Sequence, residues 1–171
     1  MFGGLDMVVT NAAAWRFGPI ATATGKDFDA IFPTNARSTF TAMHGAAKRV
    51  RDGPRVVAIS AGLALMPRPE TAMYGASEAA INHLARVLAS ELGPRHITVN
   101  SVLPGAFNTD ALKENPDKEN YGSDFIAGEI AATPLDRLGE PLDIADMVAF
   151  LVSDEGRWNT GQNIGAGGGM F

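Results

Sequence analysis

Tyr74 and Glu78 are the two residues of this sequence whose types and spacing bear most directly on chemistry. A tyrosine phenol can pass a proton to or from an oxygen atom of a bound molecule when its pKa falls well below the usual value of about 10. Residues four apart on a helix share one face, with about 5–6 Å between their Cβ atoms. A carboxylate at that distance opposes ionisation of the phenol, so we expect Glu78 to raise the pKa of Tyr74.

The size of this effect depends on how exposed the carboxylate is. With an effective dielectric constant of about 20, a unit charge about 5.5 Å away contributes roughly 3 kcal/mol, or about two pKa units. The simplest interpretation of Glu78 is a solvated helix charge, which salt would screen. A new catalytic role for Glu78 is the alternative. Under either interpretation, the negative charge of Glu78 raises the pKa of Tyr74 and so opposes ionisation of its phenol.

Length, composition and charge narrow the class of protein. The 171 residues suffice for one domain, residues 1–171, with a substantial core. A net charge of −5 predicts neither a nucleic-acid partner nor a membrane partner. The sequence has no cysteine, and His44, His83 and His96 lack metal-ligand spacing, so we expect no metal site. Without a signal-like start or a long apolar run, we expect a cytoplasmic protein.

The elements that must position these residues alternate between strand and helix signals, which is typical of a parallel sheet covered by helices on both faces. Thr24 and Asp27 form a predicted capping box, and Pro33 should kink the helix that it opens. Residues 106–133 are predicted to be a mobile flap, and the glycine-rich segment 165–169 a flexible tail. The predicted strands are 5–10, 55–60, 97–103 and 161–164; the predicted helices are 27–51, 72–92, 125–131 and 142–153.

Five short motifs follow one another in a characteristic order. They are LDMVVTNAA at 5–13, YGASE at 74–78, PGAFNT at 104–109, PLDRLGEP at 134–141 and NTGQ at 159–162. Their joint order resembles that of the classical short-chain dehydrogenase/reductase family, and the resemblance covers essentially all 171 residues. No single motif is decisive alone.

The resemblance implies a catalytic tetrad in which two of the four positions are altered. Tyr74 matches the family's catalytic tyrosine, and Asn35 matches its asparagine, although Asn35 could serve only backbone groups near the kink. Ala61 stands where the family has a serine that orients the substrate carbonyl. Glu78 stands where the family has a lysine that lowers the tyrosine pKa and holds the cofactor ribose. Ser60 is adjacent to Ala61, but its side chain should point to the opposite face of the strand.

The resemblance also implies contacts with NAD or NADP. The matching positions are Asn11, Ala12, Pro104, Gly105, Phe107 and Thr109. The family's glycine-rich turn, which leads into a helix that holds the pyrophosphate, has no counterpart in this sequence. We therefore expect the C-terminal portion of a Rossmann-like, doubly wound parallel sheet, lacking the first three strands and the phosphate turn, with impaired cofactor binding.

Several functions fit these features. The first is an oxidoreductase by descent, for NAD(P)-linked carbonyl or alcohol substrates, that is catalytically impaired or inactive. The alternatives are a non-catalytic oligomerising protein that pairs with itself or with a full-length relative, a truncated gene product, and, more distantly, a cofactor-independent lyase. In the family the helices equivalent to 27–51 and 72–92 form a dimer interface, so we expect a homo-oligomer.

Overall fold

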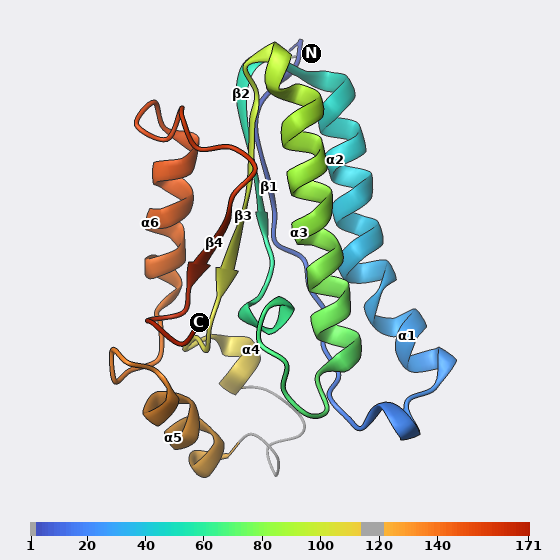
Figure 1. Cartoon of the computed structure of the whole chain (residues 1–171), viewed down its shortest axis with the longest axis vertical. Helices are drawn as coiled ribbons and strands as arrows, with labels where there is room; N and C mark the ends of the chain where they lie inside the picture. The colour runs from blue at the N-terminus through green and yellow to red at the C-terminus, as the bar shows by residue number, and fades with distance from the viewer. Residues whose placement is uncertain (1–2, 114–121) are drawn as a thin grey trace.

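The molecule is built around a parallel sheet of four strands in the order β1-β2-β3-β4 (Figure 1). The computed structural model describes residues 3–113 and 122–171. Helices α2 and α3 cover one face of the sheet and α6 covers the other, which confirms the predicted α/β class. The strands are β1 Leu5–Thr10, β2 Val50–Ile59, β3 Thr98–Pro104 and β4 Asn163–Ala166.

The second strand begins earlier than the sequence predicts. The Asp-Gly-Pro sequence at 52–54 is typical of a stop between elements, yet it lies inside β2 as an irregularity. Leu5 pairs with Val50 and Met7 with Arg55, so the extra residues of β2 bulge out of the ladder. Gly53 has a φ of 90°, which favours glycine and lets the chain turn and continue as a strand.

The helix predicted over 27–51 is divided into two. The capping box of Thr24 and Asp27 is confirmed, and it opens α1 at Gly25–Ile31. A π-helical turn follows at Pro33–Arg37 and leads into α2, Ser38–Arg49. Proline cannot supply the N–H of a regular helical hydrogen bond, which accounts for the irregular turn at this point.

The remaining helices lie close to their predicted positions. The helix predicted over 72–92 is confirmed as α3, Ala72–Leu92, and the one predicted over 142–153 is α6, Pro141–Val152. Within the predicted flap, the structure has α4 at Asp110–Lys113 and α5 at Ser123–Ala132. Part of that flap, 114–121, lies outside the described residues, so its mobility stays a prediction.

Two apolar clusters lie on the two faces of the sheet. On the α2 and α3 side, residues such as Val56, Ile81 and Val99 are buried together. On the α6 side a smaller cluster is formed around Val57 and Leu151. The outer strand β1 is less well covered: its stripe of exposed apolar side chains is Leu5, Met7 and Val9. In the described part of the chain, no helix is long and apolar enough to cross a membrane.

Candidate active site

Tyr74 lies in the first turn of α3, close to the end of β2. Its ring meets that of Phe17 edge to face, with the centroids 5.7 Å apart and the planes at 65°. The next residue, Gly75, is packed against the short 3₁₀ helix η3, Gly62–Ala64. The packing is so close that a Cβ atom at Gly75 would lie 2.7 Å from the carbonyl oxygen of Leu63. The turn that carries Tyr74 is thus fixed directly against the segment that follows β2.

Asn35 connects three segments around this turn. It is fully buried within the π-helical turn, where its amide oxygen accepts from the N–H of Ala14 at 2.7 Å. Its amide nitrogen lies 2.9 Å from the carbonyl oxygen of Ala14, 3.0 Å from Oγ of Ser77 and 2.8 Å from Oε1 of Glu78. Asn35 therefore holds the loop after β1 against α3, which is a long-range role rather than the local one considered at the kink.

Glu78 is only 1% exposed, so the expectation of a solvated helix charge is wrong. The inner face of α3 carries this carboxyl into the polar cluster around Asn35. Burial raises the pKa of Glu78 to about 7, while the hydrogen bond from Asn35 partly opposes the rise. Among the described residues no cation forms an ion pair with Glu78. Its protonated form is therefore populated near neutral pH.

The pKa of Tyr74 lies well above its ordinary value. Burial is the larger cause, and the neighbouring charge of Glu78 adds to it. The direction agrees with the sequence prediction, although desolvation contributes more than the charge. At neutral pH the phenol is protonated and serves as a hydrogen-bond donor rather than as a base.

The position before η3 offers no hydroxyl to a ligand. Ala61 is buried and caps η3 without a side-chain hydrogen bond. The adjacent Ser60 is buried too, and its hydroxyl donates to the backbone carbonyl of Glu78 at 3.1 Å. This hydrogen bond ties Ser60, the residue after β2, to α3.

The loop at the end of β3 keeps a defined shape. The N–H of Asn108 donates to the carbonyl of Gly139 at 2.8 Å, and the N–H of Gly139 donates to the carbonyl of Ala106 at 3.0 Å. The ring of Phe107 lies over Gly139, where a side chain would overlap it. Thr109 accepts at Oγ1 from the N–H of Leu112 at 3.3 Å. Pro104 ends β3 and Gly105 begins this loop, so the four predicted cofactor residues around the end of β3 lie on one supported segment.

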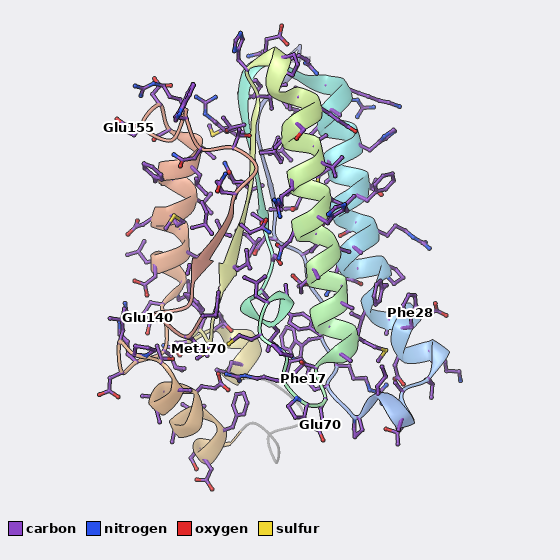
Figure 2. All side chains as sticks on the ribbon, viewed as in Figure 1. Phe17, Phe28, Glu70, Glu140, Glu155 and Met170 are labelled. Carbon is purple, nitrogen blue, oxygen red and sulfur yellow. The ribbon has the colours of Figure 1, made fainter. Side chains whose placement is uncertain are left out.

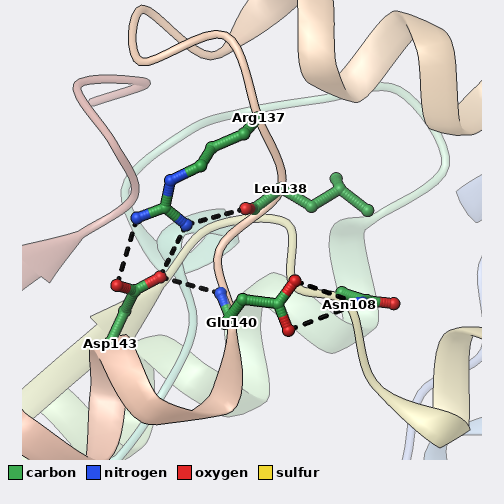
Figure 3. A network of polar contacts seen from close by, with 5 residues as sticks. All are labelled: Asn108, Arg137, Leu138, Glu140 and Asp143. Atoms are coloured by element: carbon green, nitrogen blue, oxygen red, sulfur yellow. Dashed lines mark hydrogen bonds and ion pairs between the residues drawn. The ribbon is translucent and has the colours of Figure 1, made fainter.

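A second polar network, which sequence reasoning missed, supports the same loop (Figure 3). Arg137 binds both carboxylate oxygens of Asp143, at 2.7 and 3.1 Å, and Asp143 accepts from the N–H of Glu140 at 2.8 Å. The Glu140 carboxylate in turn accepts from the amide of Asn108 at 3.0 Å. Arg137 is the main cause that lowers the pKa of Asp143 to about 2. The spacing of Glu140 and Asp143 around Pro141, a capping box at the start of α6, was the sequence signal for it.

These residues fit a dinucleotide only in part. Asn11 and Ala12 follow β1 and are exposed at the same end of the sheet as the loop after β3. Within the described ranges, however, no glycine-rich turn leads into a helix. Gly168 and Gly169 have φ values of 62° and 90°, but a Cβ atom at either would lie 2.7 to 3.0 Å from side chains of the 133–134 segment. This segment is packed against protein and forms no phosphate cradle.

Other binding features are limited. Among the described residues no group of three or more His, Asp or Glu side chains could hold a metal ion. A pocket of about 200 Å³ is lined by Phe107, Thr133, Leu135 and the Arg137–Asp143 pair. It is separate from the turn that carries Tyr74, whose neighbours are Phe17 and η3.

Comparisons with known proteins place this geometry in a family. The sequence profile described as Enoyl-(Acyl carrier protein) reductase matches residues 1–171. An uncharacterized oxidoreductase of Methylorubrum extorquens is 38% identical over 169 residues, which cover 99% of this chain and 67% of that protein. Versicolorin reductase 1 of Aspergillus parasiticus is 37% identical over 178 residues, covering 99% of this chain and 68% of the relative.

A solved structure gives the same result. The angucycline C-6 ketoreductase LanV, crystallised with bound NADP, is 34% identical and superposes with a TM-score of 0.85 over 98% of this chain and 63% of that protein. The chain thus spans about two thirds of the length of the proteins that it matches. On the evidence of its sheet, its motifs and these relatives, the chain belongs to the short-chain dehydrogenase/reductase family.

Proposed function

We propose that this chain is an oxidoreductase by descent whose hydride-transfer chemistry is impaired. The observation that carries the proposal is the buried carboxyl of Glu78, hydrogen-bonded to Asn35 in the place where the family has a lysine. An ammonium group there would lower the pKa of Tyr74, whereas Glu78 raises it. Ala61 removes the hydroxyl that would orient a carbonyl oxygen.

The same observations bear on NAD or NADP. A dinucleotide bound near Tyr74 would meet the supported loop after β3, and when bound it would supply the hydride. The residues of this chain do not complete its site, because Glu78 is shut off from solvent and the described glycines form no phosphate cradle. Tyr74 can still donate a hydrogen bond to a carbonyl oxygen. Ligand binding without turnover is therefore the behaviour that these side chains support best.

Titration with NADPH, followed by its fluorescence, tests the proposal. We expect no saturable binding below millimolar cofactor and no oxidation of NADPH with ketone substrates. The double variant Ala61→Ser, Glu78→Lys restores the family's two missing groups without adding a phosphate cradle, so we expect it to bind NADPH no better. Saturable sub-millimolar binding or turnover by the unmodified chain would contradict the proposal.

The second candidate function, a non-catalytic oligomerising protein, is favoured by the outer surface of α2 and α3. Phe40 on α2 is 52% exposed and Val87 on α3 is 43% exposed. Large apolar side chains on neighbouring helices are typical of a surface that another chain covers. We therefore propose that the chain pairs with itself, or with a full-length relative, through these helices. Light scattering coupled to size exclusion should show a dimer or larger species, and a Phe40→Glu, Val87→Lys variant should shift it to monomer.

A further inference from the structure

The carboxyl of Glu78 shares one hydrogen-bond donor with two other acceptors. The amide nitrogen of Asn35 lies 2.8 Å from its Oε1, but it also lies 2.9 Å from the carbonyl oxygen of Ala14 and 3.0 Å from Oγ of Ser77. Two amide hydrogens therefore serve three acceptors. An ionised carboxylate accepts at about four positions, so Asn35 alone does not satisfy it.

The other groups around this carboxyl do not make up the shortfall. The hydroxyls of Ser60 and Ser77 donate instead to the backbone carbonyls of Glu78 and Tyr74. Tyr74 is the titratable group one turn away on α3, and its phenol stays protonated near neutral pH. In the neighbouring helices the charged and titratable side chains are exposed, among them Lys26, Asp29, Arg37, His44, His83 and Arg86. An ionised Glu78 is thus a buried charge without a partner, which is costly.

One irregular segment borders this cluster. Residues 11–19, between β1 and α1, contain neither helix nor strand. Isolated contacts hold the segment in place, namely those of Ala14 with Asn35, Arg16 with Asp27, Phe17 with Tyr74 and Gly18 with Glu70. Figure 2 shows Phe17 and Glu70 together beside the first turn of α3. The helices and the strand around Glu78 have regular backbone hydrogen bonds, so segment 11–19 is the part of the enclosure that opens most easily.

We propose that Glu78 is a pH-sensitive switch that opens segment 11–19 when its carboxyl ionises. With the proton in place, Asn35 holds Ala14 and the segment stays closed beside Tyr74. When the proton leaves to solvent, water has to enter to supply the missing donors, and segment 11–19 moves aside. The inference goes beyond the proposed function, because it concerns neither hydride transfer nor cofactor binding.

The direction of the switch follows from the burial of the carboxyl. Burial raises the pKa of Glu78 from 4.5 to about 7 in the closed form. The closed segment is therefore most stable below pH 4.5 and loses this stability as the pH rises through about 7. Asp27, which pairs with Arg16 of the same segment, has a pKa that is lowered, chiefly by its hydrogen bond with the Thr24 side chain. It stays ionised above about pH 5 and adds no transition there.

Hydrogen exchange followed by mass spectrometry tests the switch on the unmodified chain. From about pH 5 to about pH 8, and after correction for the intrinsic pH dependence of exchange, the amides of 11–19 should lose protection relative to those of β3. The loss should exceed about 10-fold and reach at most about 100-fold, the limit that the raised pKa sets over this range. Protection that stays constant relative to β3 would overturn the inference.

Tryptophan fluorescence gives a second readout, because Trp15 follows Ala14 and is 39% exposed. The other tryptophan, Trp158, is 95% exposed, so a Trp158→Phe background isolates the signal at little cost in stability. Between the same pH values, quenching of Trp15 by acrylamide should rise about 2-fold as its exposure grows toward completion. Far-ultraviolet circular dichroism should stay constant. Unchanged quenching, or a parallel loss of circular dichroism, would contradict a local opening.

Two variants on α3 assign the transition to its residue. Glu78→Gln cannot ionise, so it should remove the pH dependence in both readouts. Glu91→Gln, its matched control, replaces an exposed carboxyl on the same helix and should leave the transition unchanged. The three histidines are present in both variants, so a transition that persists in Glu78→Gln belongs to other groups and refutes the switch. Neither readout involves NADPH, so the result is independent of the proposed function.

Discussion

Glu78 and Asp143 each belong to a polar network at this end of the sheet, and the pKa values of their carboxyls are shifted in opposite directions. Glu78 is buried and bound by neutral donors, and burial raises its pKa to about 7. Asp143 is exposed and bound by Arg137, and its pKa falls to about 2 (Figure 3). The same functional group is thus half-protonated in one place and fully ionised in the other. The comparison teaches that burial without a cation keeps the carboxyl of Glu78 partly protonated, whereas exposure beside Arg137 keeps that of Asp143 ionised.

Removal of Asn35 should give the largest difference between the two networks. Asn35→Ala leaves the carboxyl of Glu78 and both backbone groups of Ala14 without their buried partner. Since each stranded buried group costs about 1–3 kcal/mol, we expect a loss of about 4 kcal/mol in the free energy of unfolding. Urea denaturation at neutral pH measures it. The control is Asn108→Ala, its counterpart in the exposed network, which should lose less than about 1 kcal/mol of the free energy of unfolding. Similar losses in both variants would contradict the difference between the buried and the exposed network.

A pH titration of stability should give the next largest effect. The folded pKa of Glu78 is about 7 and its ordinary value is 4.5. Because the folded state holds the proton more tightly, stability is greatest below pH 4.5 for this group and is lost as the pH rises through about 7. The difference amounts to at most about 3 kcal/mol. Denaturation curves between these pH values check it.

The matched control for the titration is Glu78→Gln. The amide has a similar shape and cannot ionise, so the variant should lose the pH dependence between 4.5 and 7 while remaining folded. A profile as steep as that of the unmodified chain would assign the pH dependence to other groups.

Replacement of Asp143 should have the smallest effect. Its contribution has the opposite sign: it is present above the ordinary pKa of 3.8 and is lost as the pH falls through about 2. Asp143→Asn removes the ion pair with Arg137 and weakens the cap of α6. We expect a lower thermal midpoint at low salt, with a difference that shrinks at high salt because the pair is exposed. A salt-independent loss larger than that of Asn35→Ala would reverse the order proposed here.

Sequence patterns predicted the helices and strands better than they predicted the surroundings of individual side chains. The apolar periodicity of α3 and the capping box at Thr24 are local signals, and both were confirmed. The surroundings of Glu78 are not a local property, since its hydrogen-bond partner Asn35 lies 43 residues earlier, on a π-helical turn. The ring of Phe171 packs against Gly62, more than a hundred residues away in the sequence. Such contacts form only when the strands have assembled into the sheet.

The stripe on β1 has a consequence for how the protein behaves in concentrated solution. Leu5, Met7 and Val9 lie on β1, which pairs with β2 alone among the described strands. An edge of this type readily adds a strand from a second molecule, because backbone hydrogen bonds and apolar burial act together. We therefore expect association through β1 to grow with protein concentration, which light scattering over a concentration series measures.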